Sequence, residues 1–328
     1  MLFIPDGEVV AALERPLLLS AIEQAFIDLA RGVMVNPVPS HMVDENDDTS
    51  VHPMVATAIN HRLVVTKVLN DSPARAAKGE ARQRSSMMVT DLDSGDLVAV
   101  LSGGSITAAR TAAASAIATK HLARPGSSVL GLIGAGRLAV EHAHFITRVM
   151  PGIEEIVVWS RSSGTSARFC DSVSDLGLRV RAVGDPREVC ACADIVCTLT
   201  PATEPVVRGE WLRPGMHINV VGAPPRPDHR EVDSEAIRRS VVVVDNRQIA
   251  MRVSGELVAA VHDGVLANDT VLPELGDIIV GQVPGRQDLN EVTLFDSVGL
   301  AAQDLAAVRI VLGHHSDMRP IGERASAP

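Results

Sequence analysis

The first third of the chain changes from a helical to a strand-like pattern of apolar residues. Up to about Arg31 the apolar positions recur at helical spacing, and Pro16 divides this stretch into two helices because proline fits the first turn of the second. The acidic segment 44–48 is expected to be a solvated hairpin tip. Strands are predicted at 54–59, 63–69, 86–91 and 97–101, and their direct succession favours an antiparallel sheet. An alanine-rich helix follows from about 106 to 122.

From Ser127 onwards the pattern becomes a regular alternation of apolar strands and helices. The run SVLGLI is apolar almost throughout, as in a strand covered on both faces, and the turn and helix GAGRLAVEHAHFITRV follow it. Further strand-like segments are IEEIVVWS, LRVRAV, DIVCTLT, HINVVG and VVVVD, with short loops and helical segments among them. This alternation predicts an α/β fold with a doubly wound parallel sheet of the Rossmann type. The tail ASAP is expected to be disordered.

The turn after SVLGLI carries a candidate phosphate-binding motif. The pattern G-x-G-x-x-G/A is matched by Gly134, Ala135, Gly136, Arg137, Leu138 and Ala139. Gly134 permits the tight turn, Gly136 lets the backbone approach a pyrophosphate, and Ala139 lets the helix pack close to the strand. A glycine turn without a ligand is the alternative. The preceding strand, the following helix and the second strand about 20 residues on favour dinucleotide binding.

The end of the second strand of this region bears on the choice of cofactor. An acidic residue there would bind the ribose hydroxyls of NAD, whereas arginine accommodates the 2′-phosphate of NADP. The residues present are Ser160, Arg161 and Ser162, and none is acidic. We therefore predict a preference for NADP(H), with NAD(H) possible if Arg161 is only an exposed surface charge.

The composition narrows the class of protein. With 328 residues, the chain is long enough for two domains. Its net charge is −10, its basic residues form no run, and aromatic residues make up 2%, which argues against a nucleic-acid partner. No apolar run approaches the ~18 residues of a membrane span, and the first residues lack the pattern of a secretory signal. We therefore expect a cytoplasmic protein with no membrane partner.

The cysteines and histidines give no sign of a metal site. No C-x-x-C pair occurs among Cys170, Cys190, Cys192 and Cys197. They are predicted to be reduced thiols packed as small apolar residues, with a redox or ligand role as the alternative. His142 and His144 are two positions apart on one predicted helix and so cannot share a face. We expect no metal.

Six segments, in this order along the chain, resemble the ornithine cyclodeaminase/mu-crystallin family. They are VVTKVLN, ITAARTAAASAIATKHLARP, GLIGAGRLAVEHA, DIVCTLTPATEPVV, HINVVGAPPRPDHREVD and TLFDSVGLAAQDLAA. The resemblance implies a Rossmann dinucleotide-binding domain at 123–302. That domain would be inserted into an α+β substrate-binding and dimerisation domain made of 1–122 and 303–328. It also implies a homodimer that transfers hydride at carbon–nitrogen bonds of small amino or imino acids bearing a carboxylate.

The resemblance carries specific roles to matching positions. Lys67 and Arg110 match the family's catalytic and substrate-binding lysine and arginine, which hold the substrate carboxylate. A lysine on a buried strand needs an anionic partner or a lowered pKa, and a guanidinium can bind a carboxylate through two hydrogen bonds. Ordinary surface charges are the alternative for both. The expected cofactor contacts are Thr111, Thr198, Thr200, Pro201, Val221, Gly222, Ser297, Val298 and Gly299.

Two positions depart from the family pattern. Members that bind amino acids have a further arginine about where this chain has His41, which is thus a candidate substrate-binding residue. Cyclodeaminases have an aspartate where this chain has Pro224, and Asp228 does not match that position. The departures favour reduction of an imine, or oxidation of an amine, by an NAD(P)-dependent enzyme. An ammonia-releasing cyclodeaminase of ornithine or lysine, and a non-catalytic protein that binds NADPH and a ligand, remain alternatives.

Overall fold

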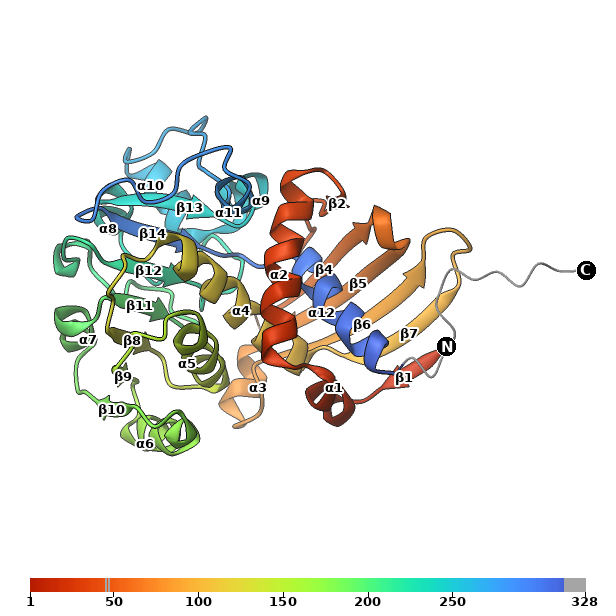
Figure 1. Cartoon of the computed structure of the whole chain (residues 1–328), viewed down its shortest axis with the longest axis horizontal. Coiled ribbons are helices and arrows are strands. Elements are labelled where there is room, and N and C mark those ends of the chain that lie inside the picture. Colours follow the sequence, from red (N-terminus) through yellow and green to blue (C-terminus); the bar gives the residue numbers. More distant parts are fainter. Residues whose placement is uncertain (45, 47, 316–328) are drawn as a thin grey trace, which may run out of the picture.

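Two seven-stranded sheets organise the chain into two lobes (Figure 1). The computed structural model describes residues 1–44, 46 and 48–315. The expected disordered tail and residues 45 and 47 of the acidic segment lie outside the described residues. Helix α4 (Gly104–Leu122) lies between the two lobes.

The first sheet is largely antiparallel, as predicted. Its strand order is β1-β7-β6-β5-β4-β2, with β3 also paired to β4. The strands are β1 (Leu2–Ile4), β2 (Met34–Val35), β3 (Met42–Asp44), β4 (Thr49–Ala58), β5 (Leu63–Asp71), β6 (Gln83–Asp91) and β7 (Leu97–Ser102). The four predicted strands are confirmed as β4 to β7. The short β1 was missed, and it pairs with β7 in parallel.

Helices from both ends of the chain accompany this sheet. They are α1 (Asp6–Ala12), α2 (Arg15–Ala30), α3 (Pro73–Ala77) and α12 (Ala301–His314), with a 3-10 turn at Ile59–His61. Pro16 lies in the first turn of α2, as predicted. Helix α12 packs against β4, β5 and α2, so the last described helix returns to the lobe in which the chain begins (Figure 1). This return places residues 303 and 304 over the inner face of the first sheet.

The second sheet is parallel throughout, as predicted for a Rossmann fold. Its order is β10-β9-β8-β11-β12-β14-β13. The strands are β8 (Val129–Ile133), β9 (Glu155–Trp159), β10 (Arg179–Ala182), β11 (Ile195–Thr198), β12 (His217–Val220), β13 (Ser240–Val244) and β14 (Val292–Asp296). Strand β14 enters between β12 and β13, which the sequence analysis missed. The order on either side of β8 leaves a crevice at the carboxyl ends of the strands, where ligands bind in such sheets.

Helices connect the parallel strands and complete the second lobe. They are α5 (Arg137–Val149), α6 (Ser163–Ser172), α7 (Pro186–Cys192), α8 (Ser234–Arg238), α9 (Arg247–Val253), α10 (Gly255–His262) and α11 (Leu275–Ile279). Short 3-10 turns span Ser174–Leu176 and Gly209–Trp211.

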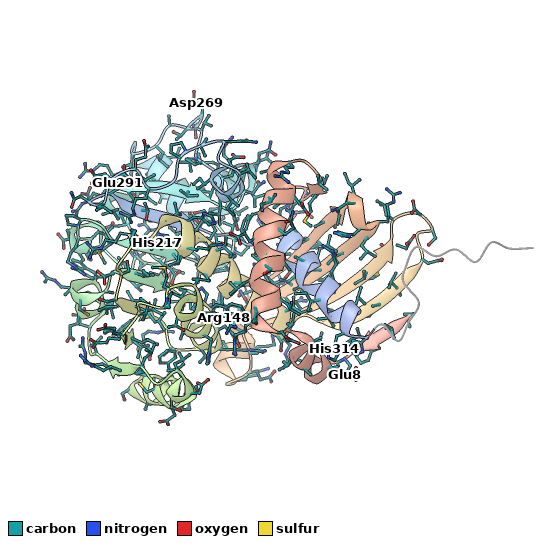
Figure 2. The ribbon with its side chains drawn as sticks, in the orientation of Figure 1. Glu8, Arg148, His217, Asp269, Glu291 and His314 are labelled. Atoms are coloured by element: carbon teal, nitrogen blue, oxygen red, sulfur yellow. The ribbon has the colours of Figure 1, made fainter. Side chains whose placement is uncertain are left out.

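Helix α4 joins the lobes through a buried polar seam. Small residues let it approach α5 closely, and Ser115 Oγ lies 2.9 Å from His142 Nε2. Further along, Asn219 Nδ2 donates to Thr119 Oγ1 at 2.9 Å. Figure 2 shows the neighbouring His217 inside the second lobe. Burial lowers the pKa of His142 to about 4, so this histidine is neutral at neutral pH and serves packing.

The cysteines are free thiols, as predicted. Cys190 and Cys197 are buried, and burial raises the pKa of each thiol to about 12, which makes them unreactive. Among the described residues, no helix combines the length and apolar character needed to cross a membrane.

Candidate functional site

The turn between β8 and α5 has the geometry of a phosphate cradle. Gly134 has a φ of +113°, and a Cβ there would lie 2.6 Å from the carbonyl oxygen of Leu199, so only glycine fits. Gly136 precedes α5, and a Cβ there would meet nothing within 4 Å, so its backbone faces open space. Ala139 is fully buried. The turn therefore fits a pyrophosphate bound at the helix N-terminus.

A cavity of about 490 Å³ opens beside this turn. The predicted residues that line it are Gly134, Gly136, Ser160, Arg161, Ser162, Thr200 and Pro201. Trp159 and Glu204 also line it. Arg161 is exposed, and the Ser160 hydroxyl donates to the carbonyl oxygen of Ser162 at 2.7 Å. The cavity continues from the phosphate cradle towards the end of β9, where the ribose of a dinucleotide lies in this fold.

A second cavity, of about 280 Å³, lies between the lobes. Nine predicted residues line it: Arg110, Thr111, Arg137, Leu138, Val221, Gly222, Ser297, Val298 and Gly299. Gln83, Ser85 and Thr107 from the first lobe also contribute. The Arg137 guanidinium reaches α4, where it donates to the Ser105 hydroxyl. The structure thus brings together side chains from the turn at Gly134–Leu138, which we call the nucleotide turn, from α4 and from the first sheet. We refer to this cavity as the interlobe cleft.

A buried ion cluster lies at one wall of the interlobe cleft. Lys67 Nζ on β5 is 3.2 Å from both carboxylate oxygens of Asp304 on α12. Arg110 Nε donates to the same Asp304 Oδ1 at 3.1 Å, and Arg110 Nη1 donates to Gln303 Oε1 at 2.7 Å. Lys67 and Asp304 are fully buried, whereas Arg110 also lines the cleft. Within the cluster one aspartate therefore carries two cations, which leaves one excess positive charge. Outside the cluster, the buried Asp245 also interacts with Arg110.

Within this cluster the pKa of Lys67 is lowered to about 8. Burial is the main cause, because it disfavours the charged ammonium, and Arg110 acts in the same direction. The Asp304 carboxylate opposes them by stabilising the ammonium. Lys67 therefore changes its protonation state close to neutral pH, which suits a group that exchanges a proton.

Asp304 and Gln303 were missed by the sequence analysis. Both lie in the segment GLAAQDLAA, which was recognised only as part of the family resemblance. An acidic residue within an otherwise apolar helix was the available signal, since a buried carboxylate needs a partner. Their partners Arg110 and Lys67 are 193 to 237 positions away along the chain, so the pairing could not be predicted.

Gly299 shapes the space around Arg110. Its φ is +81°, and a Cβ there would lie 2.8 Å from Arg110 Nη1 and 3.0 Å from Nη2. The guanidinium therefore rests directly on the backbone of the segment after β14. A side chain at position 299 would push it away from its place in the cleft.

Four predicted residues line neither cavity: His41, Lys67, Ala135 and Thr198. Ala135 lies between the two motif glycines, Thr198 is buried at the end of β11, and Lys67 sits in the ion cluster. His41 stacks on His52 with ring centroids 6.2 Å apart. Both line a small adjoining cavity that shares Pro225, Val298 and Gly299 with the interlobe cleft.

The position of the expected second arginine is held by His41, whose ring neighbour His52 is buried. Burial lowers the pKa of His52 to about 4, and His41 and Arg226 act in the same direction against Asp71. Pro224 lines the interlobe cleft where cyclodeaminases have an aspartate. Asp228 is held elsewhere, by two hydrogen bonds from Arg226 at 3.0 and 2.7 Å. The described lining of the interlobe cleft and of the His41 cavity contains no Asp or Glu. Glu256 and Asp296 line another small cavity, which shares Pro224 with the cleft.

Within the described part of the chain, no three His, Cys, Asp or Glu side chains are placed to hold a metal ion.

Comparisons with known proteins place the chain among enzymes of one family. Residues 6–318 match the ornithine cyclodeaminase/mu-crystallin family. The ketimine reductase mu-crystallin of Mus musculus is 34% identical over 298 residues, covering 90% of this chain and 91% of that protein. Among solved structures, the Δ1-pyrroline-2-carboxylate reductase of Thermococcus litoralis, in complex with NADH and L-proline, has a TM-score of 0.92 at 31% identity and covers 96% of this chain and 98% of its own.

A second solved structure is similar to the same extent. An archaeal alanine dehydrogenase dimer with bound NAD has a TM-score of 0.90 at 30% identity, and covers 97% of this chain and 96% of its own. Both structures therefore match the two lobes together and not the Rossmann sheet alone. The chain belongs to the ornithine cyclodeaminase/mu-crystallin family.

Proposed function

We propose that the protein is an NAD(P)-dependent oxidoreductase that reduces the carbon–nitrogen double bond of a small imino acid or oxidises the corresponding amine. The observation that carries the proposal is the excess positive charge of the Lys67–Asp304–Arg110 cluster at the wall of a cleft shared with the nucleotide turn. The similar ketimine reductase, pyrroline-carboxylate reductase and alanine dehydrogenase act on such bonds.

The residues present fit a dinucleotide. The backbone of Gly134 to Leu138 would hold the pyrophosphate, and Ser160 to Ser162 would contact the ribose at one end. Thr111 would contact the diphosphate, and Thr200 and Pro201 would lie beside the ribose. Val221, Gly222, Ser297, Val298 and Gly299 would surround the nicotinamide, which supplies or accepts the hydride when bound. Their backbone groups and small side chains leave room for a flat ring.

The substrate carboxylate would bind at Arg110. The guanidinium lines the cleft, and Asp304 supplies only one negative charge for two cations, so Arg110 can also bind the substrate carboxylate. Lys67 would hold the proton that the substrate nitrogen gains or loses. Asp304 Oδ1 contacts both Lys67 Nζ and Arg110 Nε, so a single carboxylate separates the lysine from the guanidinium that would bind the substrate. Binding at Arg110 then orients the carbon that reacts.

The lining of the cleft favours simple reduction over cyclodeamination. A cyclodeaminase must hold a second, cationic amino group of ornithine or lysine, and a carboxylate is the natural partner for it. The described lining of the interlobe cleft and of the His41 cavity offers neutral and cationic groups instead. Asp304 is already shared by two cations.

The decisive experiment measures consumption of NADPH and NADH with Δ1-pyrroline-2-carboxylate and other cyclic imines, and with keto acids plus ammonia or amines. Ammonia release from ornithine and lysine is followed in parallel. We expect stoichiometric loss of the reduced cofactor with an imine. Ammonia release without net change in cofactor would identify a cyclodeaminase, and cofactor binding without turnover would identify a ligand-binding protein.

The same assay tests Lys67 when it is run from pH 6 to 10. Lys67 carries its proton below its pKa of about 8, so the rate of imine reduction should fall as the pH rises through about 8. Amine oxidation needs the neutral lysine and should rise over the same range. Lys67→Met should lower turnover roughly 10²- to 10⁴-fold in both directions. Unchanged pH profiles in this variant would exclude Lys67 as the proton-exchanging group.

Placement of Arg110 is tested by a matched pair of glycine substitutions. Gly299 and Gly264 both have positive φ, +81° and +73°, but a Cβ on Gly264 meets nothing within 4 Å. Both alanine variants bear the same backbone strain, of order 1–2 kcal/mol, and only Gly299→Ala displaces Arg110. We expect kcat/KM for the imino acid to fall roughly tenfold to hundredfold in Gly299→Ala and to stay within twofold in Gly264→Ala. Equal effects in both would contradict carboxylate binding at Arg110.

A preference for NADP(H) is proposed on the basis of Arg161. Its guanidinium lies in the lining of the 490 Å³ cavity with Ser160 and Ser162, which can bind a 2′-phosphate. Arg161→Ala should weaken NADPH binding roughly tenfold and leave NADH binding within twofold, measured by fluorescence titration. Arg179→Ala, which removes an exposed arginine at the start of β10, is the control. Equal losses for the two cofactors would show that Arg161 does not select between them.

A homodimer that forms through the first sheet is also proposed. The domain boundaries given above are proposed with it, as is a cytoplasmic location, in which free thiols are stable. A row of residues crosses the outer face of the sheet in register: Val55, Thr66, Met88, Val100 and Phe3. Val55, Met88 and Phe3 are exposed. An exposed apolar row of this kind is typical of a contact between subunits.

The dimer is tested by placing a charge in that row. Met88→Glu should convert the dimer into a monomer, because the new carboxylate would be buried against the second copy. Light scattering after gel filtration gives the mass. Val271→Glu, at an exposed apolar position of the other lobe, should leave the mass unchanged. A wild-type protein that is already monomeric would contradict the proposal.

A further inference from the structure

A buried carboxylate ties together the ends of two neighbouring strands of the parallel sheet. Glu231 is fully buried in the connection between β12 and α8. Its Oε1 accepts hydrogen bonds from the Thr200 backbone N–H at 2.6 Å and from the Thr200 hydroxyl at 2.7 Å. Its Oε2 accepts from the Thr198 hydroxyl at 2.8 Å and from the Gly222 N–H at 2.7 Å. All four partners donate, so both oxygens are used fully.

The four donors belong to segments that touch each other. Thr198 ends β11, Thr200 follows it, and Gly222 follows β12. A Cβ on Gly222 would lie 2.1 Å from the Thr200 nitrogen, so the two backbones are in direct contact and no side chain can separate them. Glu231 therefore fastens two loops that are already packed as closely as backbones allow.

Glu231 is itself held rigidly by its own backbone. Its carbonyl oxygen accepts from Val206 N at 2.8 Å and Val207 N at 3.0 Å, and its N–H donates to Glu256 Oε1 at 2.7 Å. The neighbouring residue Val232 pairs with Val207. Because both its backbone and its carboxylate are hydrogen-bonded, Glu231 holds the loop after β11 and the loop after β12 at a fixed separation.

The two loops form walls of two different cavities. Thr200 lines the 490 Å³ cavity beside the nucleotide turn, whereas Gly222 lines the interlobe cleft. We infer that Glu231 is a positioning residue that fixes these two walls relative to each other, so that a dinucleotide spanning both cavities is held with its reactive ring in the interlobe cleft. The inference rests on the proposed function, because it concerns the cofactor of that reaction. Glu231 itself touches neither substrate nor cofactor.

The protonation state of Glu231 matters to this role. Only the ionised carboxylate can accept four hydrogen bonds without placing its own O–H against a donor. Burial raises the pKa of Glu231 to about 7; the hydrogen bonds from Thr200 and Thr198 oppose this rise, and Glu256 on α10 adds to it. Asp296 on β14 also interacts with Glu231, and Arg230 acts on Glu256. Protonation below about pH 7 would remove one of the four bonds.

The first test replaces the carboxylate by an amide of the same size. In Glu231→Gln one oxygen becomes an NH₂ group that faces donors, so the connection between the loops is broken. We expect the Kd of NADPH and NADH, from fluorescence titration, and their KM to rise roughly tenfold or more, with a smaller change in KM for the imino acid. Glu154→Gln, an exposed acid before β9, is the control and should change neither.

A second variant decides the matter if Glu231→Gln fails to fold. Thr198 is fully buried and lines neither cavity, yet its hydroxyl donates to Glu231. Thr198→Val should therefore raise the KM of the cofactor about threefold to tenfold without direct contact. If both variants fold, the loss in the double variant should be smaller than the product of the single losses, because both remove the same connection.

The pH dependence separates positioning from a purely structural role. In the wild type, the KM of the cofactor should rise as the pH falls below about 7, and Glu231→Gln should lose this dependence. A wild-type protein that binds neither cofactor would overturn the proposed function. A wild-type protein that binds cofactor while Glu231→Gln and Thr198→Val keep its Kd, KM and pH profile would overturn the inference alone.

Discussion

The ion cluster around Asp304 is the interaction on which the rest of the site depends. A buried charge costs several kcal/mol unless it is paired, so Lys67, Arg110 and Asp304 are stable at this depth only together. They come from a strand of the first sheet, from the helix between the lobes and from the last described helix. Their pairing therefore fixes how these three elements meet, and it leaves a positive charge at the wall of the interlobe cleft.

Buried carboxylates also hold the walls of the cleft that carry no charge of their own. Glu231 fastens the loops after β11 and β12. Asp245, at the end of β13, accepts hydrogen bonds from the Ser297 hydroxyl at 2.9 Å and from the Gly299 N–H at 2.7 Å. Gly299 in turn is packed against the Arg110 guanidinium. The buried carboxylates thus fix the positions of these loops. The loop that contains Gly299 in turn fixes the position of the Arg110 guanidinium.

Local sequence was enough to predict the elements that depend on neighbouring residues. The glycines of the nucleotide turn, the proline at the start of α2 and the alternation that gives a parallel sheet all act within a few positions along the chain. The position of β14 between β12 and β13 was not predicted, because strand order depends on hydrogen bonds between distant segments and not on adjacent residues. The parallel pairing of β1 with β7 likewise joins segments that are almost a hundred residues apart.

The sequence by itself determined the fold class, the glycine turn between β8 and α5 and, through the family resemblance, the two cations Lys67 and Arg110. Each of these is expressed in residue type and spacing over a short stretch. Only the tertiary structure decided which anion those cations share, that His41 lies beside His52, and that Glu231 connects two loops. The physical reason is that the partner of a buried charge is chosen by three-dimensional proximity, and Asp304 is 237 positions from Lys67 along the chain.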